Sequence, residues 1–474
     1  MIRAFFILIF AASVINGADK PNILWIVVED MSQDLGCYGN KAVTTPNLDR
    51  LASRGMLFKN MFTTGPACSP SRTGLASGVF QTTLGAHHMR YSEELKPLLK
   101  APYKTLPQMM QSLGYFTGNI KNICETGTGK DDWLFKINGP RWQTQKWSEL
   151  VKKQPFFGQI NSSESHRAFS HKSKFPVKKD LITIPPYYPD HPVSRNDWSG
   201  YLSEVNRADE LVGNILAKLK EDGLSENTIV IFISDHGRPM TRGKNWLYDS
   251  GTQIPLIIYI PEKLQKPGMY KSGSENTQLL SAVDLVAETI SLAGGEVPDW
   301  MQGRSFLKEG SKPRDYVPTA VDRIGNVDSC SRAIRTDKYK YIRNFKQPGS
   351  VTACATPYRM ASHPIYHLLN IMNEKQLLNP VQKQLLNPIA EEELYDLEKD
   401  PFETENLIGK SEYESVYKEM KGILDKWISE SGDKGFEKDS EEIVKYFHDY
   451  GVKTMKSRGK AIEKQRQTVL KFFE

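Results

Sequence analysis

Three continuous apolar runs constrain the fold of this 474-residue chain more than any other feature. They cover residues 22–28, 228–234 and 255–260 and are rich in β-branched side chains. A run without polar alternation is typical of a strand buried on both faces. Apolar residues at helical spacing over 202–219, ending near Gly223, predict a helix, and residues 105–113 predict another. This alternation predicts an α/β fold with a mostly parallel sheet covered by helices on both faces.

The last third of the chain has a different character. Residues 331–343 alternate as in an exposed antiparallel hairpin, with a turn at Thr336-Asp337, and from about Ser411 the chain is charged and helical. We therefore expect two domains, covering residues 19–312 and 313–474. The second would be smaller and would contain a short antiparallel sheet and terminal helices.

The N-terminus reads as an export signal. A basic start at residues 1–3 precedes an apolar run over 4–15 and the small residues Gly17 and Ala18, which predicts a signal peptide over 1–18. The run is shorter than the roughly 20 apolar residues of a membrane span, so we expect a periplasmic or secreted protein without stable membrane insertion. A net charge of +6 permits an acidic polysaccharide partner, and no nucleic-acid partner is expected.

Five cysteines leave one unpaired in an exported chain. Cys330 and Cys354 are close enough in sequence for a loop-closing disulfide, whereas Cys37 and Cys124 also read as small buried thiols. The fifth, Cys68, begins the pentapeptide Cys68-Ser69-Pro70-Ser71-Arg72, which is followed by small, helix-compatible residues.

Two pairs of possible metal ligands follow the first two apolar runs. Glu29 and Asp30 come directly after one run, and Asp235 and His236 directly after the other. Sites in parallel sheets form beyond the carboxyl ends of the strands, so the two pairs can converge on one cation. Mostly oxygen ligands favour a hard cation such as calcium, although imidazole is commoner on transition metals.

These motifs together resemble the formylglycine-dependent sulfatases of the alkaline phosphatase superfamily. In that family the cysteine of Cys-x-Pro-x-Arg is oxidised by a formylglycine-generating maturation enzyme, and the hydrated aldehyde attacks a sulfate ester. The resemblance implies an alkaline phosphatase-like catalytic domain over 19–312, formylglycine at Cys68, and a sulfated glycan substrate. It also implies a calcium site formed by Glu29, Asp30, Asp235 and His236. Glu29 is a departure, because many members have aspartate there.

The resemblance extends to the groups that would hold the sulfate. Arg72 lies at an expected helix N-terminus, where backbone amides favour anions. Lys244, within residues 243–252, resembles the family's basic residue on the sulfate oxygens. The family's Gly-Lys-x-His motif is missing, but Gly129-Lys130-Asp131-Asp132 offers the same arrangement with Asp132 in the histidine's place. Lys121 is the alternative to Lys130.

Three histidines complete the candidate site. His166 follows the expected strand that begins at Pro155-Phe156-Phe157, and it resembles the family histidine that contacts the leaving-group oxygen. Histidine can donate a proton near neutral pH. His87 and His88 follow the helix of the nucleophile and are predicted to line substrate subsites.

The substrate is less constrained than the reaction. Residues 155–167, 184–190 and 243–248 show a looser resemblance to the heparan N-sulfatase (N-sulfoglucosamine sulfohydrolase) subgroup. Similar sequences also occur in bacterial enzymes acting on carrageenan and related algal glycans, so the sugar, the sulfated position and exo or endo action stay open. Two alternatives remain: a phosphonate or phosphate monoester hydrolase of the same superfamily, and an inactive secreted glycan-binding protein in which Cys68 is never oxidised.

Overall fold

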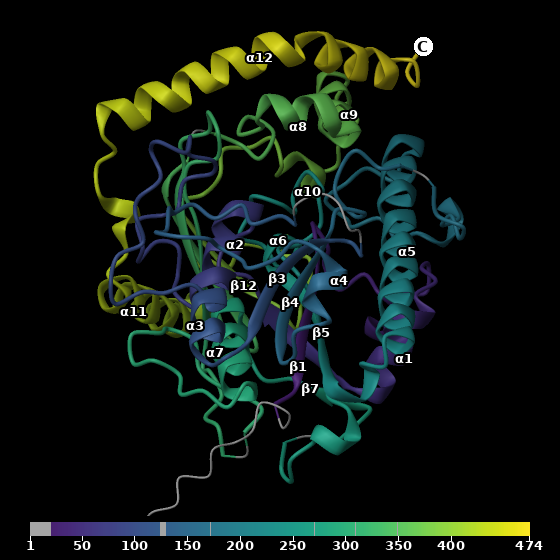
Figure 1. The fold of residues 1–474 in the computed structure, drawn as a ribbon. Helices are drawn as coiled ribbons and strands as arrows, with labels where there is room; N and C mark the ends of the chain where they lie inside the picture. The colour runs from purple at the N-terminus through teal and green to yellow at the C-terminus, as the bar shows by residue number, and fades with distance from the viewer. Residues whose placement is uncertain (1–19, 124–128, 171, 270, 309, 348) are drawn as a thin grey trace, which may run out of the picture.

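The computed structural model describes residues 20–123, 129–170, 172–269, 271–308, 310–347 and 349–474. Within them the chain forms an eight-stranded sheet flanked by helices and a four-stranded sheet (Figure 1). The predicted signal peptide and Cys124 lie outside the described residues. No helix in the described part of the chain has the length and apolar character that crossing a membrane requires.

The central sheet has the strand order β3-β4-β1-β5-β6-β2-β7, with β8 paired to β2. Its strands are β1 (Asn22–Val28), β2 (Met56–Phe62), β3 (Phe116–Lys121), β4 (Phe156–Ser162), β5 (Thr228–Ser234), β6 (Gln253–Tyr259), β7 (Ser274–Asn276) and β8 (Leu280–Ser281). β1 runs parallel to both β4 and β5, and β3 runs parallel to β4. β6 is antiparallel to both β5 and β2. The predicted mostly parallel sheet is confirmed.

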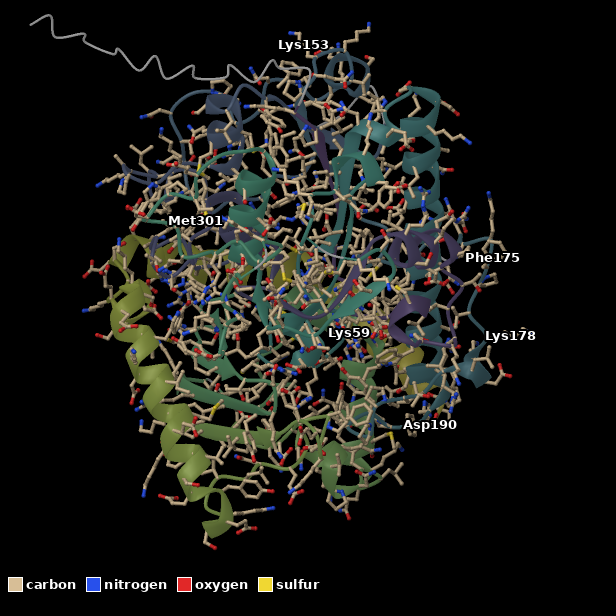
Figure 2. All side chains as sticks on the ribbon, turned by 90° about the horizontal axis from the view of Figure 1, so that it is seen from below. Lys59, Lys153, Phe175, Lys178, Asp190 and Met301 are labelled. Atoms are coloured by element: carbon tan, nitrogen blue, oxygen red, sulfur yellow. The ribbon has the colours of Figure 1, made fainter. Side chains whose placement is uncertain are left out.

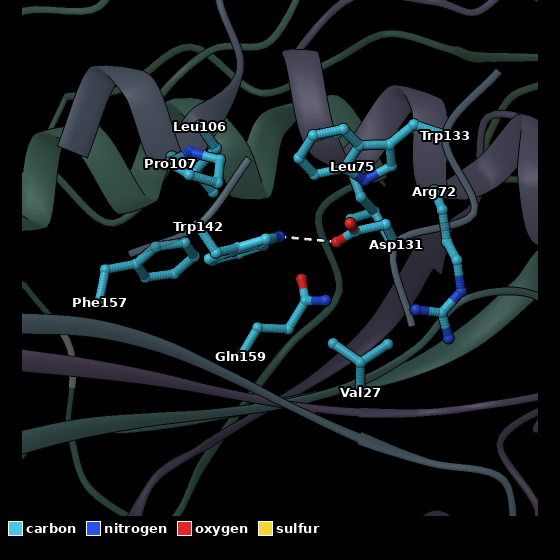
Figure 3. A pocket seen from close by; sticks show the side chains of 11 residues that line it. Val27, Arg72, Leu75, Leu106, Pro107, Asp131, Trp133, Trp142, Phe157 and Gln159 are labelled. Carbon is cyan, nitrogen blue, oxygen red and sulfur yellow. Dashed lines mark hydrogen bonds between the residues drawn. The ribbon is translucent and has the colours of Figure 1, made fainter. Parts of the chain in front are cut away.

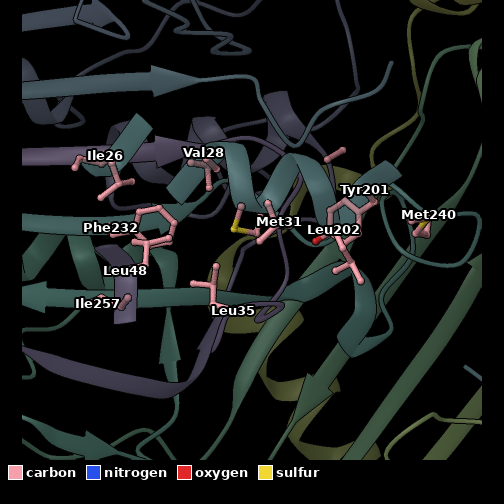
Figure 4. Packing of buried hydrophobic residues seen from close by; sticks show 14 of the residues in the cluster. Ile26, Val28, Met31, Leu35, Leu48, Tyr201, Leu202, Phe232, Met240 and Ile257 are labelled. Atoms are coloured by element: carbon pink, nitrogen blue, oxygen red, sulfur yellow. The ribbon is translucent and has the colours of Figure 1, made fainter. Parts of the chain in front are cut away.

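Helices cover both faces of this sheet because its central strands are apolar on both sides. Alternate side chains of β1 enter two separate cores. Leu24, Ile26 and Val28 pack with α1 (Pro46–Arg54) and α5 (Pro192–Glu221), whereas Ile23, Trp25 and Val27 pack with α3 (Leu106–Ser112) and α7 (Ala282–Leu292). Figure 4 shows members of the first core. The helices are α1 (Pro46–Arg54), α2 (Cys68–Ser77), α3 (Leu106–Ser112), α4 (Trp147–Leu150), α5 (Pro192–Glu221), α6 (Asp249–Thr252), α7 (Ala282–Leu292), α8 (Pro357–Ser362), α9 (Pro364–Glu374), α10 (Pro380–Lys383), α11 (Glu414–Ser431) and α12 (Glu441–Leu470).

The ends of the helices follow local sequence signals. Thr105 caps α3 through a capping box with Gln108. Gly223, just beyond α5, has φ +71°, as expected for the predicted glycine C-cap. Gly78 ends α2 with φ +70°, and a Cβ added there would meet the Met301 side chain at 2.8 Å. Figure 2 labels Met301 among the side chains of the molecule. The positive φ therefore favours glycine where the helix that begins at Cys68 stops.

The second sheet is antiparallel, with the order β12-β11-β10-β9. Its strands are β9 (Val317–Val321), β10 (Cys330–Arg335), β11 (Tyr339–Lys346) and β12 (Glu392–Asp396). The predicted hairpin is confirmed in its pairing, but its predicted exposure is wrong, because every residue of β10 is buried. Ile334 packs against α11, while Ala333 faces the core shared with the first sheet. The boundary between residues 312 and 313 stays a prediction.

The disulfide that the sequence allowed between Cys330 and Cys354 does not form. Cys330 and Cys354 are both free thiols. The Cys330 Sγ lies 3.9 Å from the Gly435 carbonyl oxygen, and the Cys354 Sγ lies 4.0 Å from Gln347 Oε1. Burial raises the pKa of Cys330 to about 12 and that of Cys354 to about 11. Cys37 is also a free, half-buried thiol.

Candidate functional site

The two pairs of predicted ligands meet at the carboxyl end of the central sheet. β1 lies between β4 and β5, and the ladder continues past the strands, because the Glu29 N–H donates to the Ser162 carbonyl at 3.0 Å and the Asp235 N–H to the Val28 carbonyl at 3.1 Å. The Asp30 N–H donates to Asp235 Oδ1 at 3.0 Å. Parallel pairing therefore brings together residues that are more than 200 positions apart in sequence.

Cys68 is the first residue of α2 and is buried at this edge. Its Sγ lies 3.3 Å from His236 Nε2, 3.3 Å from Lys244 Nζ and 3.9 Å from Asp30 Oδ1. Burial alone would raise the pKa of the thiol, but Lys130, Lys244 and His236 hold it well below its usual range. The surroundings of position 68 therefore favour negative charge.

Arg72 lies one turn further along α2 and is also buried. Its Nε is 3.0 Å from Asp235 Oδ2, and one terminal nitrogen donates to Asn161 Oδ1 at 2.7 Å. Its other terminal nitrogen is buried without a hydrogen-bond partner among the described residues. Asn161 donates in turn to Asn119 at 2.6 Å. This chain of contacts fixes the direction of the guanidinium.

A cavity of about 10 Å³ lies behind Arg72, which is room for about one water molecule. Asp131 lines it and accepts hydrogen bonds from Trp142 Nε1 at 2.6 Å and from Asn119 Nδ2 at 2.8 Å. Figure 3 shows the Trp142 indole N–H directed at Asp131 beside Arg72. Asp131 therefore belongs to the support of Arg72 rather than to the site surface.

Lys244 and Asp30 form a second buried ion pair. The Lys244 Nζ lies 2.9 and 2.8 Å from the two Asp30 carboxylate oxygens. Burial would raise the pKa of Asp30, but Lys244 and His236 hold it well below its usual value. The next residue, Asn245, donates its N–H to the Pro66 carbonyl at 2.6 Å. The loop that carries Lys244 is thus tied to the segment that precedes Cys68.

Lys130, rather than Lys121, reaches the site. Its Nζ lies 2.7 Å from Glu29 Oε2 and 3.8 Å from Asp132 Oδ2, whereas Lys121 is exposed at the end of β3. Burial raises the pKa of Glu29, although Lys130 opposes that change. Both Lys130 and Asp132 are therefore placed beside the acidic pair, and their roles stay predictions.

His166 faces the same acidic pair from the loop after β4. Its Nε2 lies 4.0 Å from both Glu29 Oε2 and Asp30 Oδ2. The other ring nitrogen, Nδ1, lies 2.5 Å from the Arg167 carbonyl oxygen. The carboxylate of Asp30 raises the pKa of His166. With 28% of its side chain exposed, His166 lies between the buried charges and solvent.

His87 and His88 make their contacts elsewhere. Both are buried, and the His88 Nε2 lies 2.7 Å from Asp439 Oδ1. The His88 ring also lies 6.0 Å from that of Phe447 on α12. These contacts connect His88 to the C-terminal segment, and the His87 ring lies 4.3 Å from that of His88. The substrate-binding role of both histidines stays a prediction.

The structure adds residues that the sequence motifs did not indicate. Arg90 bonds to Asp132 Oδ2 at 2.5 Å and to Ser69 Oγ at 3.1 Å, with half of its side chain exposed. Tyr358 of α8 has its ring 6.3 Å from that of His166, and Arg359 donates to the backbone of Thr241 at 3.2 Å and of Lys244. Arg90 comes only two residues after the predicted site residue His88, and this position could have indicated it. Tyr358 and Arg359 reach the site only through the folding of the C-terminal part.

Two overlapping groups of side chains could hold a metal ion. One contains Glu29, Asp30, Cys68 and His166, and the other contains Asp30, Cys68, Asp235 and His236; within each group the donor atoms lie within 4.8 Å of one another. Asp30 and Cys68 belong to both. Three carboxylates suit a hard divalent cation that prefers oxygen ligands. The residues present therefore fit a divalent metal beside position 68.

Comparison with known proteins agrees with this geometry. The sulfatase family model matches residues 21–295, and the model for the N-sulphoglucosamine sulphohydrolase C-terminal region matches residues 240–390. An ulvan-active sulfatase of Formosa agariphila is 30% identical, over 91% of this chain and 78% of the relative. The human N-sulphoglucosamine sulphohydrolase is 24% identical, over 88% of this chain and 91% of the relative.

The fold is also shared with solved structures. A 2-O GAG sulfatase superposes with a TM-score of 0.62 at 20% identity, covering 88% of this chain and 93% of that one. The matched region 21–295 contains β1, β5, α2 and both pairs of predicted metal ligands, and it spans more than half of the sequence. The chain therefore belongs to the sulfatase family, and it is a sulfatase.

Proposed function

We propose that this sulfatase hydrolyses sulfate esters or N-sulfate groups of a sulfated polysaccharide or oligosaccharide, through formylglycine made from Cys68. The observation that carries the proposal is the position of the Cys68 Sγ, 3.3 Å from both Lys244 Nζ and His236 Nε2 at a buried helix N-terminus. A nucleophile surrounded by positive charge suits attack on an anionic ester. The ulvan-active and N-sulphoglucosamine relatives support a glycan substrate.

The side chains around position 68 suit a hydrated aldehyde. Lys244 Nζ can donate to one of its hydroxyls, and Asp30 Oδ1 can accept from another. When formed, the hydrated aldehyde would supply one hydroxyl for attack on sulfur and a second that allows sulfate to leave. Its formation requires a formylglycine-generating maturation enzyme as a partner.

The basic residues, His166 and Asp132 have separate roles in this proposal. Arg72, Lys130 and Lys244 neutralise the charge on the sulfate oxygens, and their fixed positions remove the need for reorganisation during the reaction. His166 donates a proton to the departing sugar oxygen or nitrogen. Asp132, beside Lys130, accepts a proton during release of the sulfate.

Glu29, Asp30, Asp235 and His236 would hold a divalent metal, and the three carboxylates favour calcium. The metal would add positive charge against the sulfate. We infer a periplasmic or secreted location from the predicted signal peptide, since a polymeric glycan is met outside the cytoplasm.

The reaction class is tested by the release of inorganic sulfate. Protein made in a host with a maturation system should release sulfate from 4-methylumbelliferyl sulfate and from at least one of ulvan, heparan sulfate and carrageenan. The kcat/KM for aryl sulfate should exceed those for aryl phosphate and phosphonate, and Cys68→Ala should abolish turnover. Faster turnover of the phosphonate would instead favour a phosphonate hydrolase.

The two candidate lysines are distinguished by alanine substitution. Lys130→Ala should lower kcat/KM about 100-fold, because it removes a charge aimed at the sulfate and leaves Glu29 unpaired. Lys121 is exposed at the end of β3, so Lys121→Ala is the matched control and should change kcat/KM little. A larger loss of kcat/KM in Lys121→Ala than in Lys130→Ala would assign the sulfate-binding role to Lys121.

Metal dependence is tested by chelation followed by thermal unfolding. Dialysis against EDTA should lower both turnover and the unfolding midpoint, and calcium should restore both, because a ligand that binds only the folded state stabilises it. Asp30→Ala should lose the calcium-dependent rise in midpoint, whereas the exposed carboxylate variant Asp425→Ala should keep it. If adding calcium leaves the unfolding midpoint of the chelated wild-type protein unchanged, a calcium site is ruled out.

A further inference from the structure

The C-terminal helix α12 reaches the candidate site, although it lies outside both regions matched by the family models. In Figure 1 it crosses the molecule above α8 and α9. The Tyr446 hydroxyl donates to the Arg90 carbonyl at 3.4 Å, and the Arg458 guanidinium carbon lies 5.2 Å from the centre of the Tyr358 ring. Because Arg90 contacts Asp132 and Tyr358 lies beside His166, the helix extends from one side of the site to the other.

Contacts at both ends hold α12 in this position. Just before the helix, Asp439 pairs with His88 at 2.7 Å and with Arg323 at 3.0 Å. Near the other end, Val469 is buried with Val193 and Leu368. Residues between these anchors are therefore presented to the site at fixed places along the helix.

Arg458 has the features of an anion-binding residue. It is half-buried, and its guanidinium belongs to none of the ion pairs found among the described residues. A guanidinium can bind a carboxylate or a sulfate through two parallel hydrogen bonds. Its charge is thus free to meet a ligand close to the proposed proton donor.

Tyr358 connects Arg458 to the reacting end of the site. The ring is half-buried and lies 6.3 Å from that of His166, with the two planes 36° apart. The Tyr358 hydroxyl donates to the Arg167 carbonyl at 3.4 Å, which orients the ring. A flat aromatic surface held in this way can pack against the apolar face of a sugar.

We propose that Tyr358 and Arg458 form a subsite for the sugar unit on the leaving-group side of the sulfate, with Arg458 binding an anionic group of that glycan. The anion is a carboxylate or a further sulfate, since both present paired oxygens to a guanidinium. This inference rests on the proposed function, because His166 marks the leaving-group side. It makes α12 a determinant of substrate choice.

Binding to the Cys68→Ala protein tests the subsite without depending on turnover. Calorimetric titration with oligosaccharides of ulvan, heparan sulfate and carrageenan identifies the tightest ligand. In that background, Arg458→Met should raise its Kd at least about tenfold, the loss expected for one charge-assisted hydrogen-bonded contact. Methionine keeps an apolar stem over Tyr358, and Arg458→Lys should recover part of the affinity.

Lys460→Met provides the matched control, because Lys460 is an exposed cation on the same helix. Equal Kd values for the Arg458→Met and Lys460→Met proteins, or no binding of any of the three oligosaccharides, would overturn the proposal. A third outcome is oligosaccharide binding that depends on Arg458, together with no release of sulfate by the protein that retains Cys68. That outcome would contradict the proposed function but would support the subsite.

Chemical modification of the ligand distinguishes the two sources of the anion. With carboxyl-reduced oligosaccharide, the difference between the Arg458→Met and parent proteins should disappear if a carboxylate is bound and persist if a sulfate is bound. In the active enzyme, in which Cys68 is not replaced by alanine, Arg458→Met should lower kcat/KM for the oligosaccharide at least about tenfold more than for 4-methylumbelliferyl sulfate. Equal losses on both substrates would contradict a glycan subsite.

Discussion

The buried ion pair between Arg72 and Asp235 is the interaction on which the arrangement of the site depends. Removing two charges from water costs several kcal/mol for each ion, and additional hydrogen bonds to the paired groups reduce that loss. Asn161 and the Lys130 carbonyl provide further contacts to Arg72, and the Asp30 and His236 N–H groups donate to Asp235. Because Arg72 lies one turn from Cys68, the same pair fixes Cys68 against the edge of the sheet.

The same pattern recurs at the neighbouring carboxylates. Asp30 faces Lys244, and Glu29 faces Lys130, with each basic residue supplied by a different loop. The carboxylates can therefore lie beside the position of an anionic substrate without repelling it. The C-terminal part completes this arrangement, since Arg359 bonds to the backbone of Lys244, and α12 places Arg458 over Tyr358. A site that is built mainly by the first sheet is thus enclosed by residues from much later in the chain.

The sequence was most informative where chemistry and local structure coincide. Unbroken apolar runs predicted β1 and β5, and the polar residues after them predicted the converging pairs, because parallel strands end at one edge. The exposure of β10 was predicted wrongly, since alternation alone does not reveal that α11 and the first core cover opposite faces of the sheet. Tyr358 and Arg458 gave no signal, because their place beside His166 depends on packing between distant segments. The contact of His88 with Asp439 spans 351 residues and could not be read from its position after α2.

The proposed reaction depends on conversion of Cys68 to an aldehyde, whose hydrate serves as the nucleophile. The most direct measurement is labelling with an aldehyde-specific hydrazide, followed by peptide mass spectrometry, on protein from a host with a formylglycine-generating enzyme. A label is expected on the peptide that contains residue 68, and it should be lost in Cys68→Ala. An unlabelled free thiol at Cys68 in protein from a host that converts a known sulfatase in parallel would contradict the proposed reaction.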